Sequence, residues 1–484
     1  MSKKWGYLLA LLVLLEILSV ALYLGKAGQF GFPLDDAWIH QTYARNLGLR
    51  GTMAFTPGQP STGSTSFGWT LLLAAGYWLR IPFFWWTYFL GGAFAVATAF
   101  LAARLAQNYF GNFRNAVIVA VICLLEWHLA WAAVSGMEIG LFTFLVLLFC
   151  LLLNRDTSPL LLGGLVGIIV LVRPEGILFA VVYGVKLILT QPRPIKRILL
   201  DGVIFLLAFS VITGPWILFN LAYSQRPFPN TIAAKFMQYS YPWSVWKSLK
   251  YPWNVLIYFL NGPLLLLVPG AGFTIYNMAR TKNLPQLYPF AWSLTLIGLY
   301  AVALPAIYDQ GRYLMPIIPL IVIYGVEGME QLLKRFVHAL FLRSTIWLSL
   351  ASMVFLLWID GASDYAYRTQ LFNRVHMPAA EWINANTPQD AMIATHDIGI
   401  IGYYTERPIV DLAGLITPEI VPMMRDQQRM ADYLKTKRVT YVIVYTGYYR
   451  ELLTALDAHV VFSPGAEQLR AMGVEPFEIH EISR

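Results

Sequence analysis

The sequence predicts a polytopic α-helical membrane protein with about eleven spans, followed by a soluble α/β domain. Of its 484 residues, 57% are hydrophobic and only 13% are charged, about half the charged share of a typical soluble domain. Apolar runs long enough to cross a bilayer, or nearly so, recur as far as Ile359. Beyond Ile359 polar residues become frequent, and short β-rich runs alternate with amphipathic segments.

The predicted spans begin directly after the N-terminus. Lys3 and Lys4 precede an apolar run that is too long for a signal peptide and lacks a small-residue cleavage site, so we expect it to stay as a membrane anchor. Several runs are shorter than the roughly twenty residues of a span, so hydropathy alone does not define where they begin and end. The runs cover residues 5–24, 83–103, 116–134, 139–153, 160–172, 177–189, 198–221, 255–276, 289–306, 313–326 and 345–359.

Basic residues in the short loops give the predicted orientation. With these spans they all fall on one side, which the positive-inside rule makes cytoplasmic, and the N-terminus lies there too. Residues 67–79 are assigned to a short helix on the outer surface, because a full crossing would put the later basic loops on opposite faces. The net charge of +8 is then a topology signal, and we expect no nucleic-acid partner. The basic residues are Lys3, Lys4, Arg104, Arg114, Arg155, Arg193, Lys196, Arg197, Arg280, Lys282, Lys334, Arg335 and Arg343.

The polar segments gather on the outer side under this topology. The chain divides into a transmembrane domain, 1–360, whose outer loop 26–82 holds juxtamembrane helices, and an extracytoplasmic α/β domain, 361–484. In the second domain the predicted strands are 391–395, 408–411, 440–445 and 459–462, and the predicted helices are 378–386 and 418–436.

An adjacent acidic pair, Asp35 and Asp36, follows closely on the first span. Two carboxylates at the outer rim of a helical bundle can hold an alcohol and accept its proton, while the lipid phase beside them supplies a long-chain donor. The alternative is an exposed helix N-cap, because Asp before Ala-Trp-Ile is a good start signal. A helix from Ala37 would carry His40 and Tyr43 along one stripe, followed by Asn46 or Leu47.

Several motifs together resemble the GT-C glycosyltransferases. DDAWI (35–39), YARNL (43–47), FTPG (55–58) and STSFGWT (64–70) are similar to the first outer loop of that superfamily. The resemblance continues over nearly the whole chain through SGME (135–138), LVRPEG (171–176), PNTIAAK (229–235), GRYLMP (311–316) and HDIGIIGY (396–403). Within the superfamily, the nearest resemblance is to bacterial enzymes of the mycobacterial terminal arabinofuranosyltransferase type.

The resemblance implies a GT-C fold with the catalytic groups in the transmembrane domain. It also implies inverting transfer of a hexose or pentose from a polyprenyl-phosphate carrier, on the outer side of the cytoplasmic membrane. The acceptor would be a hydroxyl of a cell-envelope glycan, a lipid or a protein. The first acidic residue of the outer loop is the base in such enzymes, which is Asp35 here, with Asp36 a close second. The sequence QPSTG (59–63) departs from the nearer relatives and leaves the donor sugar open.

The chemistry of the residues agrees with this implied reaction. A sugar hydroxyl is a poor nucleophile at neutral pH, and a carboxylate that takes its proton accelerates transfer by roughly 10² to 10⁴. The departing lipid phosphate gains charge and needs cations or N–H donors. Arg173, Lys235 and Arg312 stand at outer ends of spans and are the candidate donor-phosphate ligands. The alternative for each is a side chain that reaches out to the lipid headgroups.

The candidate substrate contacts come from the same outer segments. Glu138 stands at the mouth of a span, where it could bind the acceptor, orient Asp35 or ligate a divalent cation, and its alternative role is that of a helix N-terminal acid. His396 and Asp397 follow a predicted strand and form a turn rather than a metal phosphohydrolase motif. The predicted substrate-binding residues are His40, Tyr43, Glu138, Glu175, Asn230 and His396.

No metal or cofactor is expected to be obligatory. The sequence has no dense cluster of carboxylates or histidines, although a divalent cation is left open. Cys123 and Cys150 lie in apolar runs and are expected to pack as small hydrophobic residues. No Gly-rich phosphate loop opens a helix, which favours a polyprenyl carrier over a nucleotide sugar.

Two other classes of function compete with a glycosyltransferase. A transporter or flippase of lipid-linked sugars would show inverted repeats and ionisable groups near mid-membrane. A scaffold with a glycan-binding outer domain would have no use for charged breaks such as RPEG (173–176) in an apolar hairpin. The sequence shows neither transporter feature clearly, so the enzyme is the favoured hypothesis.

Overall fold

The computed structural model describes residues 2–155, 157–189, 194–239, 244–260, 262–305, 307, 309–471 and 473–483. The chain groups into two compact units of three segments each. Unit 1 contains Met1–Lys26, Tyr88–Pro215 and Trp243–Asp364, and unit 2 contains Ala27–Thr87, Trp216–Pro242 and Tyr365–Arg484. The predicted boundary at 360/361 lies close to the start of the last segment of unit 2, but this unit also takes in the outer loop. Arg193 and Ala306, which belong to the predicted loops and spans, lie outside the described residues.

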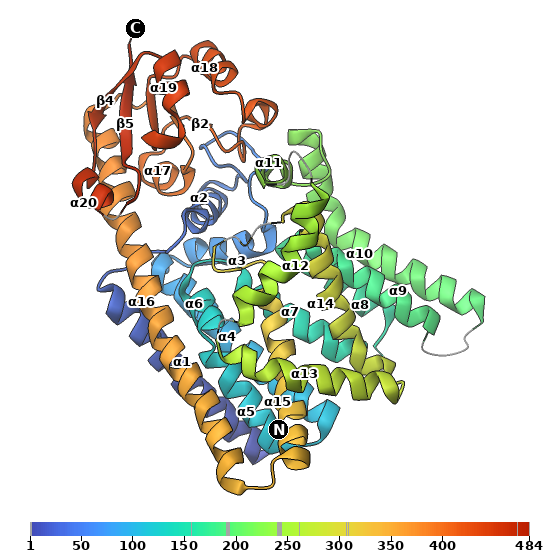
Figure 1. Ribbon diagram of the computed structural model, residues 1–484. Helices are drawn as coiled ribbons and strands as arrows, with labels where there is room; N and C mark the ends of the chain where they lie inside the picture. Colours follow the sequence, from blue (N-terminus) through green and yellow to red (C-terminus); the bar gives the residue numbers. More distant parts are fainter. Residues whose placement is uncertain are drawn as a thin grey trace. The chain divides into compact units, whose positions relative to one another are not determined.

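Helices make up most of the chain before the C-terminal region (Figure 1). Apolar stretches become helices because a helix satisfies all its backbone groups internally, which a lipid environment requires. The helices are α1 (Lys3–Ala27), α2 (Asp35–Arg50), α3 (Phe67–Trp78), α4 (Phe83–Phe110), α5 (Phe113–Leu125), α6 (Trp127–Val134), α7 (Ile139–Leu153), α8 (Pro159–Val172), η1 (Pro174–Ile177), α9 (Leu178–Leu189), α10 (Ile195–Ser224), α11 (Asn230–Tyr239), α12 (Val245–Leu260), α13 (Pro263–Arg280), α14 (Leu284–Ala303), η2 (Met315–Ile317), α15 (Ile318–Phe336) and α16 (Leu340–Asn386).

Fewer helices have the length and hydropathy of a membrane span than the apolar runs predicted. Among the described residues, six helices are long and apolar enough to cross a bilayer, or seven when a bent pair counts as one span. The other apolar runs are helical too, but α7 and α8 have only 15 and 14 residues, short of the roughly twenty that a span needs. The fold class is confirmed as a helical, multi-pass membrane protein with a C-terminal region that contains strands.

The bent pair is α5 and α6, which meet at an angle of 54°. Glu126 ends α5 with an extended backbone, and its carboxylate accepts hydrogen bonds from the N–H groups of His128 and Leu129 in the first turn of α6. A buried acid thus satisfies N–H groups that the break leaves open. The predicted run 116–134 therefore falls on two helices with a bend between them.

Two further boundaries differ from the prediction. The expected span 255–276 falls on two helices, α12 and α13, and α13 starts with a proline that suits a first helical turn. The expected span 345–359 and the separate helix 378–386 are parts of one 47-residue helix, α16, which keeps Pro378 inside it. The expected short helix 67–79 is confirmed as α3.

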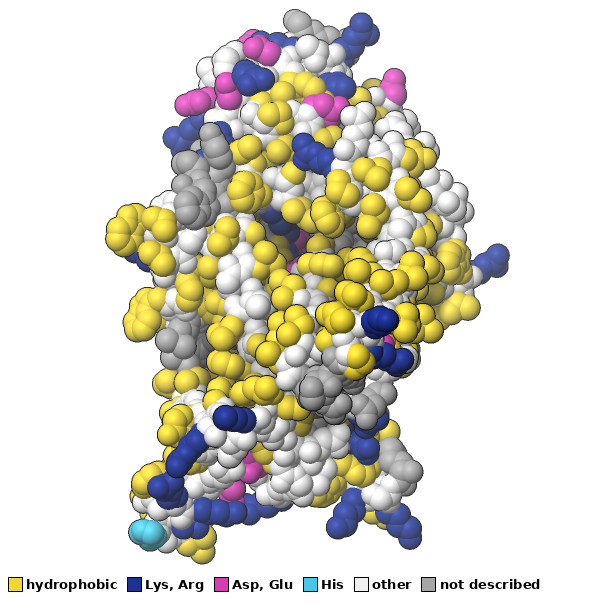
Figure 2. All heavy atoms as spheres, turned by 90° about the vertical axis from the view of Figure 1, so that its right-hand side faces the viewer, with side chains coloured by type: hydrophobic (Ala, Val, Ile, Leu, Met, Phe, Trp, Pro, Cys, Tyr) yellow, Lys and Arg dark blue, Asp and Glu magenta, His cyan; other side chains and the backbone are white. Residues whose placement is uncertain are grey.

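Hydrophobic side chains cover the outer surfaces of α9 and α10. In Figure 2 yellow side chains spread widely over the face of the molecule to which these helices belong. A surface this apolar suits contact with lipid rather than with water. The exposed residues include Val181, Val185 and Ile188 of α9 and Leu199, Leu206, Leu207 and Val211 of α10.

Unit 2 contains a five-stranded sheet in the order β2-β1-β3-β5-β4. The first three strands of the order run parallel to one another, and β5 pairs antiparallel with both β3 and β4. Four of the strands match predicted runs, whereas β5 was missed. The predicted helix 418–436 is two elements, η3 and α18. The elements are β1 (Ile393–Thr395), α17 (Ile398–Thr405), β2 (Ile409–Asp411), η3 (Pro418–Met423), α18 (Gln427–Thr436), β3 (Tyr441–Tyr445), η4 (Thr446–Tyr448), α19 (Arg450–Ala455), β4 (Ala458–Phe462), α20 (Ala466–Ala471) and β5 (Phe477–Ile482).

Helices cover both faces of this sheet. Val442 and Val444 of β3 belong to a buried hydrophobic cluster with residues of α18 and α19. The alternate residues of β3, which point the other way, meet the end of α16, where Trp382 contacts Tyr441 and His376 contacts Tyr445. The parallel strands therefore end at one edge of a covered sheet, where an α/β fold places its ligands.

Candidate active site

The acidic pair opens helix α2 in unit 2. Leu34 is the N-cap residue and makes no side-chain cap, so Asp35 and Asp36 form the first turn. Carboxylates are favoured there because the helix dipole is positive at its N-terminus. Gly51 ends the helix in the left-handed conformation, with φ of 68°. The predicted helix start is confirmed within two residues.

Asp35 caps a second helix, α17, which lies beside α2 (Figure 1). Its carboxylate oxygens accept hydrogen bonds from the N–H of Gly399 at 2.6 Å and from the N–H of Ile400 at 3.0 Å. Gly399 makes the approach possible, since a Cβ at this position would lie 2.1 Å from the Asp35 carbonyl oxygen. The glycine of the HDIG motif thus has a steric role at the acidic pair.

Asp397 is the N-cap residue of α17 but does not cap it. Its Oδ2 lies 3.0 Å from Nε2 of His376, and its Oδ1 lies 3.0 Å from Nδ1 of His396. His376 comes from α16 and is fully buried, whereas the His396 side chain is 34% exposed. The carboxylate is therefore fixed between one buried and one accessible imidazole.

The charges of this group shift one another's pKa values. Burial, followed by the charge of Asp397, raises the pKa of Asp35 well above its usual range, against the effect of the two backbone N–H donors. Burial also acts to raise the pKa of Asp397, but the bonds from His376 and His396 outweigh it and hold this pKa well below its usual range. For His396, burial acts to lower the pKa, and Asp397 more than compensates. Asp35 therefore binds a proton more readily than an ordinary aspartate.

Lys235 brings a positive charge to the same pair. Its Nζ lies 3.4 Å from Oδ2 of Asp36, and the two side chains are 20% and 23% exposed. Helix α11 is positioned by Asn230, whose side-chain amide donates to the Gly414 carbonyl, and by Thr231, which donates to the Gly63 carbonyl. The predicted phosphate ligand Lys235 thus lies next to the predicted catalytic pair, and Asn230 acts as an anchor.

The predicted stripe on α2 is buried. Tyr43 is fully buried, and its hydroxyl pairs with Ser61 and accepts the N–H of Gly63. His40 is 3% exposed. The Tyr43 contacts fix the loop that precedes α3, so substrate binding by His40 and Tyr43 stays a prediction.

The remaining predicted residues lie in unit 1, around Arg173. This guanidinium bonds Glu138 at 2.6 Å and Glu175 at 2.6 Å, and it donates to the Tyr300 hydroxyl at 3.2 Å. Tyr300 in turn donates to Glu175. All three charged side chains are at most 8% exposed. Two carboxylates therefore compensate the positive charge that was predicted to bind phosphate.

Arg312 belongs to the same aromatic environment. The guanidinium carbons of Arg173 and Arg312 lie 4.8 Å and 5.3 Å from the ring centre of Tyr313, which stacks on Tyr300. Arg312 is 1% exposed, and Asp309 lies 3.9 Å from it. Cation–π contacts of this kind hold a guanidinium within an apolar bundle.

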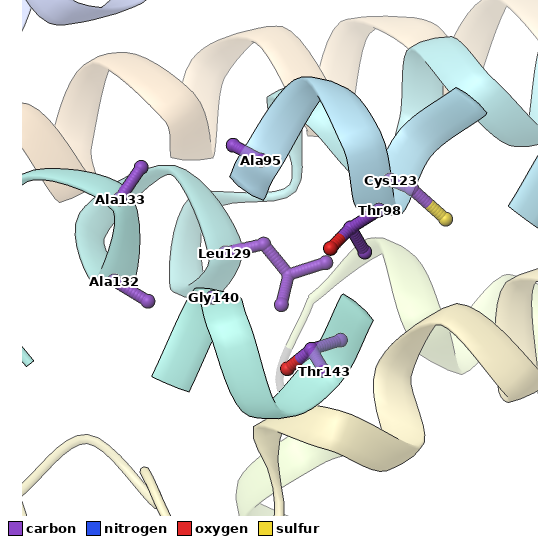
Figure 3. Close-up of a pocket in the computed structure, with 8 residues that line it drawn as sticks. All are labelled: Ala95, Thr98, Cys123, Leu129, Ala132, Ala133, Gly140 and Thr143. Carbon is purple, nitrogen blue, oxygen red and sulfur yellow. The ribbon is translucent and has the colours of Figure 1, made fainter. Parts of the chain in front are cut away.

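Unit 1 also contains a small pocket between α4, α5, α6 and α7 (Figure 3). The described residues that line it are mostly apolar, and the only hydroxyls among them belong to Thr98 and Thr143. Thr143 already donates to the Ile139 carbonyl. None of these lining residues is an Asp, Glu, His, Lys or Arg, so the pocket holds no charged side chain. The lining residues are Ala95, Thr98, Cys123, Leu129, Ala132, Ala133, Gly140 and Thr143.

The structure sorts the predicted residues into two groups. Unit 2 brings Asp35, Asp36, Lys235 and His396 into one neighbourhood, and unit 1 brings Glu138, Glu175, Arg173 and Arg312 together. Over the described part of the chain, no three His, Cys, Asp or Glu side chains are placed to hold a metal ion.

Sequence reasoning missed three participants. His376 and Tyr300 lie in helices without any local motif, and only the fold brings them to Asp397 and Arg173. Asp397 was visible in the HDIG motif, but it was interpreted as part of a turn. A signal was available there, because an Asp at a helix start can form hydrogen bonds with partners other than its own helix.

A family model, described as a domain of unknown function (DUF8728), matches residues 364–475, which lie within the last segment of unit 2. No curated protein matches the chain.

Solved structures share the fold over the full length. The crystal structure of ArnT from Cupriavidus metallidurans in the apo state has a TM-score of 0.59 at 16% identity and covers 99% of this chain and 98% of its own. The same protein bound to undecaprenyl phosphate has a TM-score of 0.60 at 16% identity, covering 100% and 99%. The Archaeoglobus fulgidus oligosaccharyltransferase tethered to an acceptor peptide has a TM-score of 0.55 at 12% identity, covering 100% of this chain and 74% of its own. These similarities give the chain a GT-C fold.

Proposed function

We propose that the protein is a membrane glycosyltransferase that moves a sugar from a polyprenyl-phosphate carrier to an acceptor hydroxyl, with inversion. One observation carries the proposal: Asp35 is held by two backbone N–H groups of α17, next to the Asp36–Lys235 ion pair. A proton acceptor and a cation thus stand side by side, as transfer from a phosphate carrier requires.

The fold supports the same reaction. The solved structures contain a molecule of this chemistry: ArnT is bound to undecaprenyl phosphate, and the oligosaccharyltransferase is tethered to an acceptor peptide. The multi-pass helices give a lipid carrier access to the protein from the bilayer. The motif resemblance adds the finer proposals of an enzyme of the mycobacterial terminal arabinofuranosyltransferase type, with a hexose or pentose donor, and of an active site on the outer side of the cytoplasmic membrane.

Asp35 is the better candidate for the base. Its partners are neutral amides, and its raised pKa favours proton uptake, whereas Asp36 is held in an ion pair with the Lys235 ammonium. Each Asp35 oxygen keeps a second lone pair for the acceptor hydroxyl. In the proposed step the acceptor oxygen forms a bond to the anomeric carbon, and the proton of the acceptor hydroxyl passes to Asp35. At the same time the bond between the anomeric carbon and the phosphate oxygen breaks, and its electron pair stays on the lipid phosphate.

Lys235 is the proposed contact for the departing phosphate, with Asp36 holding its ammonium in place. Arg173 carries two bonded carboxylates already, which favours a role in fixing Glu138 and Glu175 as acceptor contacts. For Arg312, whose side chain is 1% exposed, binding of the donor phosphate stays a prediction. No obligatory metal is proposed, and a divalent cation is left open as an alternative partner of Glu138.

Sugar transfer by the purified protein tests the proposal directly. The protein is supplied with polyprenyl-phosphate pentoses and hexoses and an envelope glycan extract, and product is followed by mass spectrometry. D35N is expected to lose roughly 10² to 10⁴ of the rate, and D36N to lose less, mainly through a higher donor KM. Movement of labelled donor between leaflets of proteoliposomes without any product would overturn the enzyme in favour of a transporter. Full activity in both variants would overturn the assignment of the acidic pair.

A further inference from the structure

The N-terminus of α17 is capped by Asp35 and not by Asp397, which occupies the N-cap position of the helix. An Asp at the N-cap position ordinarily accepts the N–H groups two and three residues on. For Asp397 these are the N–H groups of Gly399 and Ile400, and both bond Asp35 instead. Asp397 can leave them only because His376 and His396 supply other partners for its two oxygens.

His376 is the fixed end of this arrangement. It is fully buried on α16, and its ring packs against Phe372 and Phe477 with centroids 4.6 Å and 4.2 Å away. The ring cannot turn without disturbing both phenylalanines. Its Nε2 therefore holds Asp397 in one rotamer, away from α17.

We propose that Asp397, held by His376, is a positioning residue for Asp35: it leaves the N-terminus of α17 open for the Asp35 carboxylate and places a second negative charge beside it. This inference rests on the proposed function, in which Asp35 is the base. Without His376, Asp397 competes with Asp35 for the same two N–H groups. Without the charge of Asp397, Asp35 is a weaker proton acceptor.

Several charged or titratable groups face Asp35 from the surrounding elements. Asp36 lies beside it on α2, with its charge offset by Lys235 of α11. Asp397 and His396 come from the turn after β1, and Tyr445 comes from the end of β3. The negative charge of Asp397 is the largest of these charge effects on Asp35. Its removal is therefore the change that the pH dependence of Asp35 should report.

Two variants at His376 test whether this histidine keeps Asp397 away from the N-terminus of α17. H376F keeps an aromatic ring between Phe372 and Phe477 but removes the nitrogen that bonds Asp397, whereas H376Q keeps a nitrogen donor at a similar reach. We expect kcat to fall at least tenfold in H376F with little change in donor KM, and to recover in part in H376Q. Equal kcat in H376F and the wild type would overturn the inference.

The electrostatic part is tested with D397N. The acid limb of the kcat/KM profile is expected to move to lower pH by about one unit, since one charge at several ångströms acts with this strength in a protein. The matched control is H480Q, which alters another histidine of the sheet, 3% exposed on β5. H480Q is expected to leave the acid limb in place. An unmoved acid limb in D397N would overturn the proposal.

A readout that needs no activity separates this inference from the proposed function. Infrared titration of the carboxyl C=O band of Asp35, assigned by its loss in D35N, measures the protonation of Asp35 in the wild type and in D397N. A wild type without any transfer activity contradicts the proposed function alone. An Asp35 titration that is the same in D397N and the wild type contradicts the present inference, whatever the activity.

Discussion

A Cβ atom at Gly399 would lie 2.1 Å from the carbonyl oxygen and 2.7 Å from Oδ1 of Asp35. The first turn of α2 and the first turn of α17 therefore pack backbone against backbone, and only glycine allows it. The position of the proposed base depends on a residue that has no side chain.

G399A is the first prediction. The added methyl group must push α17 away from Asp35, so both N–H bonds lengthen, and the free energy of unfolding is expected to fall by about 1–3 kcal/mol. Sugar transfer is expected to fall with it, because the carboxylate loses its fixed position. Thermal unfolding in detergent and the transfer rate are the measurements. G298A on α14 is the control, since a Cβ there meets nothing within 4 Å. Wild-type behaviour of G399A would contradict the packing described.

K235M tests the proposed phosphate contact. Loss of a charge-assisted bond to the donor is expected to raise donor KM by roughly ten- to a hundredfold, with a smaller effect on acceptor KM. Initial rates at varied donor concentration check this. K247M, on the exposed side of α12, removes the same charge elsewhere. If both variants raise donor KM equally, the effect comes from general charge and not from the site.

R173M tests the buried charge cluster of unit 1. The change leaves Glu138 and Glu175 buried without their cation, which is expected to lower stability by about 3–5 kcal/mol. The double variant R173M/E138Q is expected to regain part of this loss, because it removes one of the two uncompensated charges. Unfolding in detergent is the measurement. R450M breaks the pair between Arg450 and Glu475, whose side chains are 74% and 42% exposed, and it should cost at most about 1 kcal/mol. Equal losses in R173M and R450M would contradict the buried cluster.

Asp411 gives a prediction about pH. Burial raises its pKa from 3.8 to about 6, although its carboxylate accepts N–H groups of Ala413, Leu415 and Ile416. Between these pH values the folded protein keeps a proton that the unfolded chain has released. The wild type is therefore expected to lose stability relative to D411N as the pH rises from about 4 to about 6. Denaturation midpoints of both proteins across this range check it, and a constant difference would contradict the shift.

The acidic pair illustrates what a local pattern can predict. Asp35 and Asp36 before an apolar stretch indicate a helix start, and the structure places both in the first turn of α2. The same holds for α3 and for four of the five strands, because their patterns lie within a few residues of sequence. The predicted boundaries differ at two places. At Glu126 the helix breaks, and the buried Glu126 side chain caps the helix that follows. Pro378, in contrast, lies inside one long helix and does not start a new one.

The sequence by itself determined that this is a helical membrane protein with a C-terminal α/β region, and it located the segments that carry charge, because hydropathy and helix signals are local properties. Only the tertiary structure decided which charges meet. Asp35 joins Gly399, which is 364 residues away, Asp397 joins His376, and Arg173 joins Tyr300 across 127 residues. Such pairings arise when the chain folds back to satisfy buried polar groups, and no short-range pattern encodes their partners.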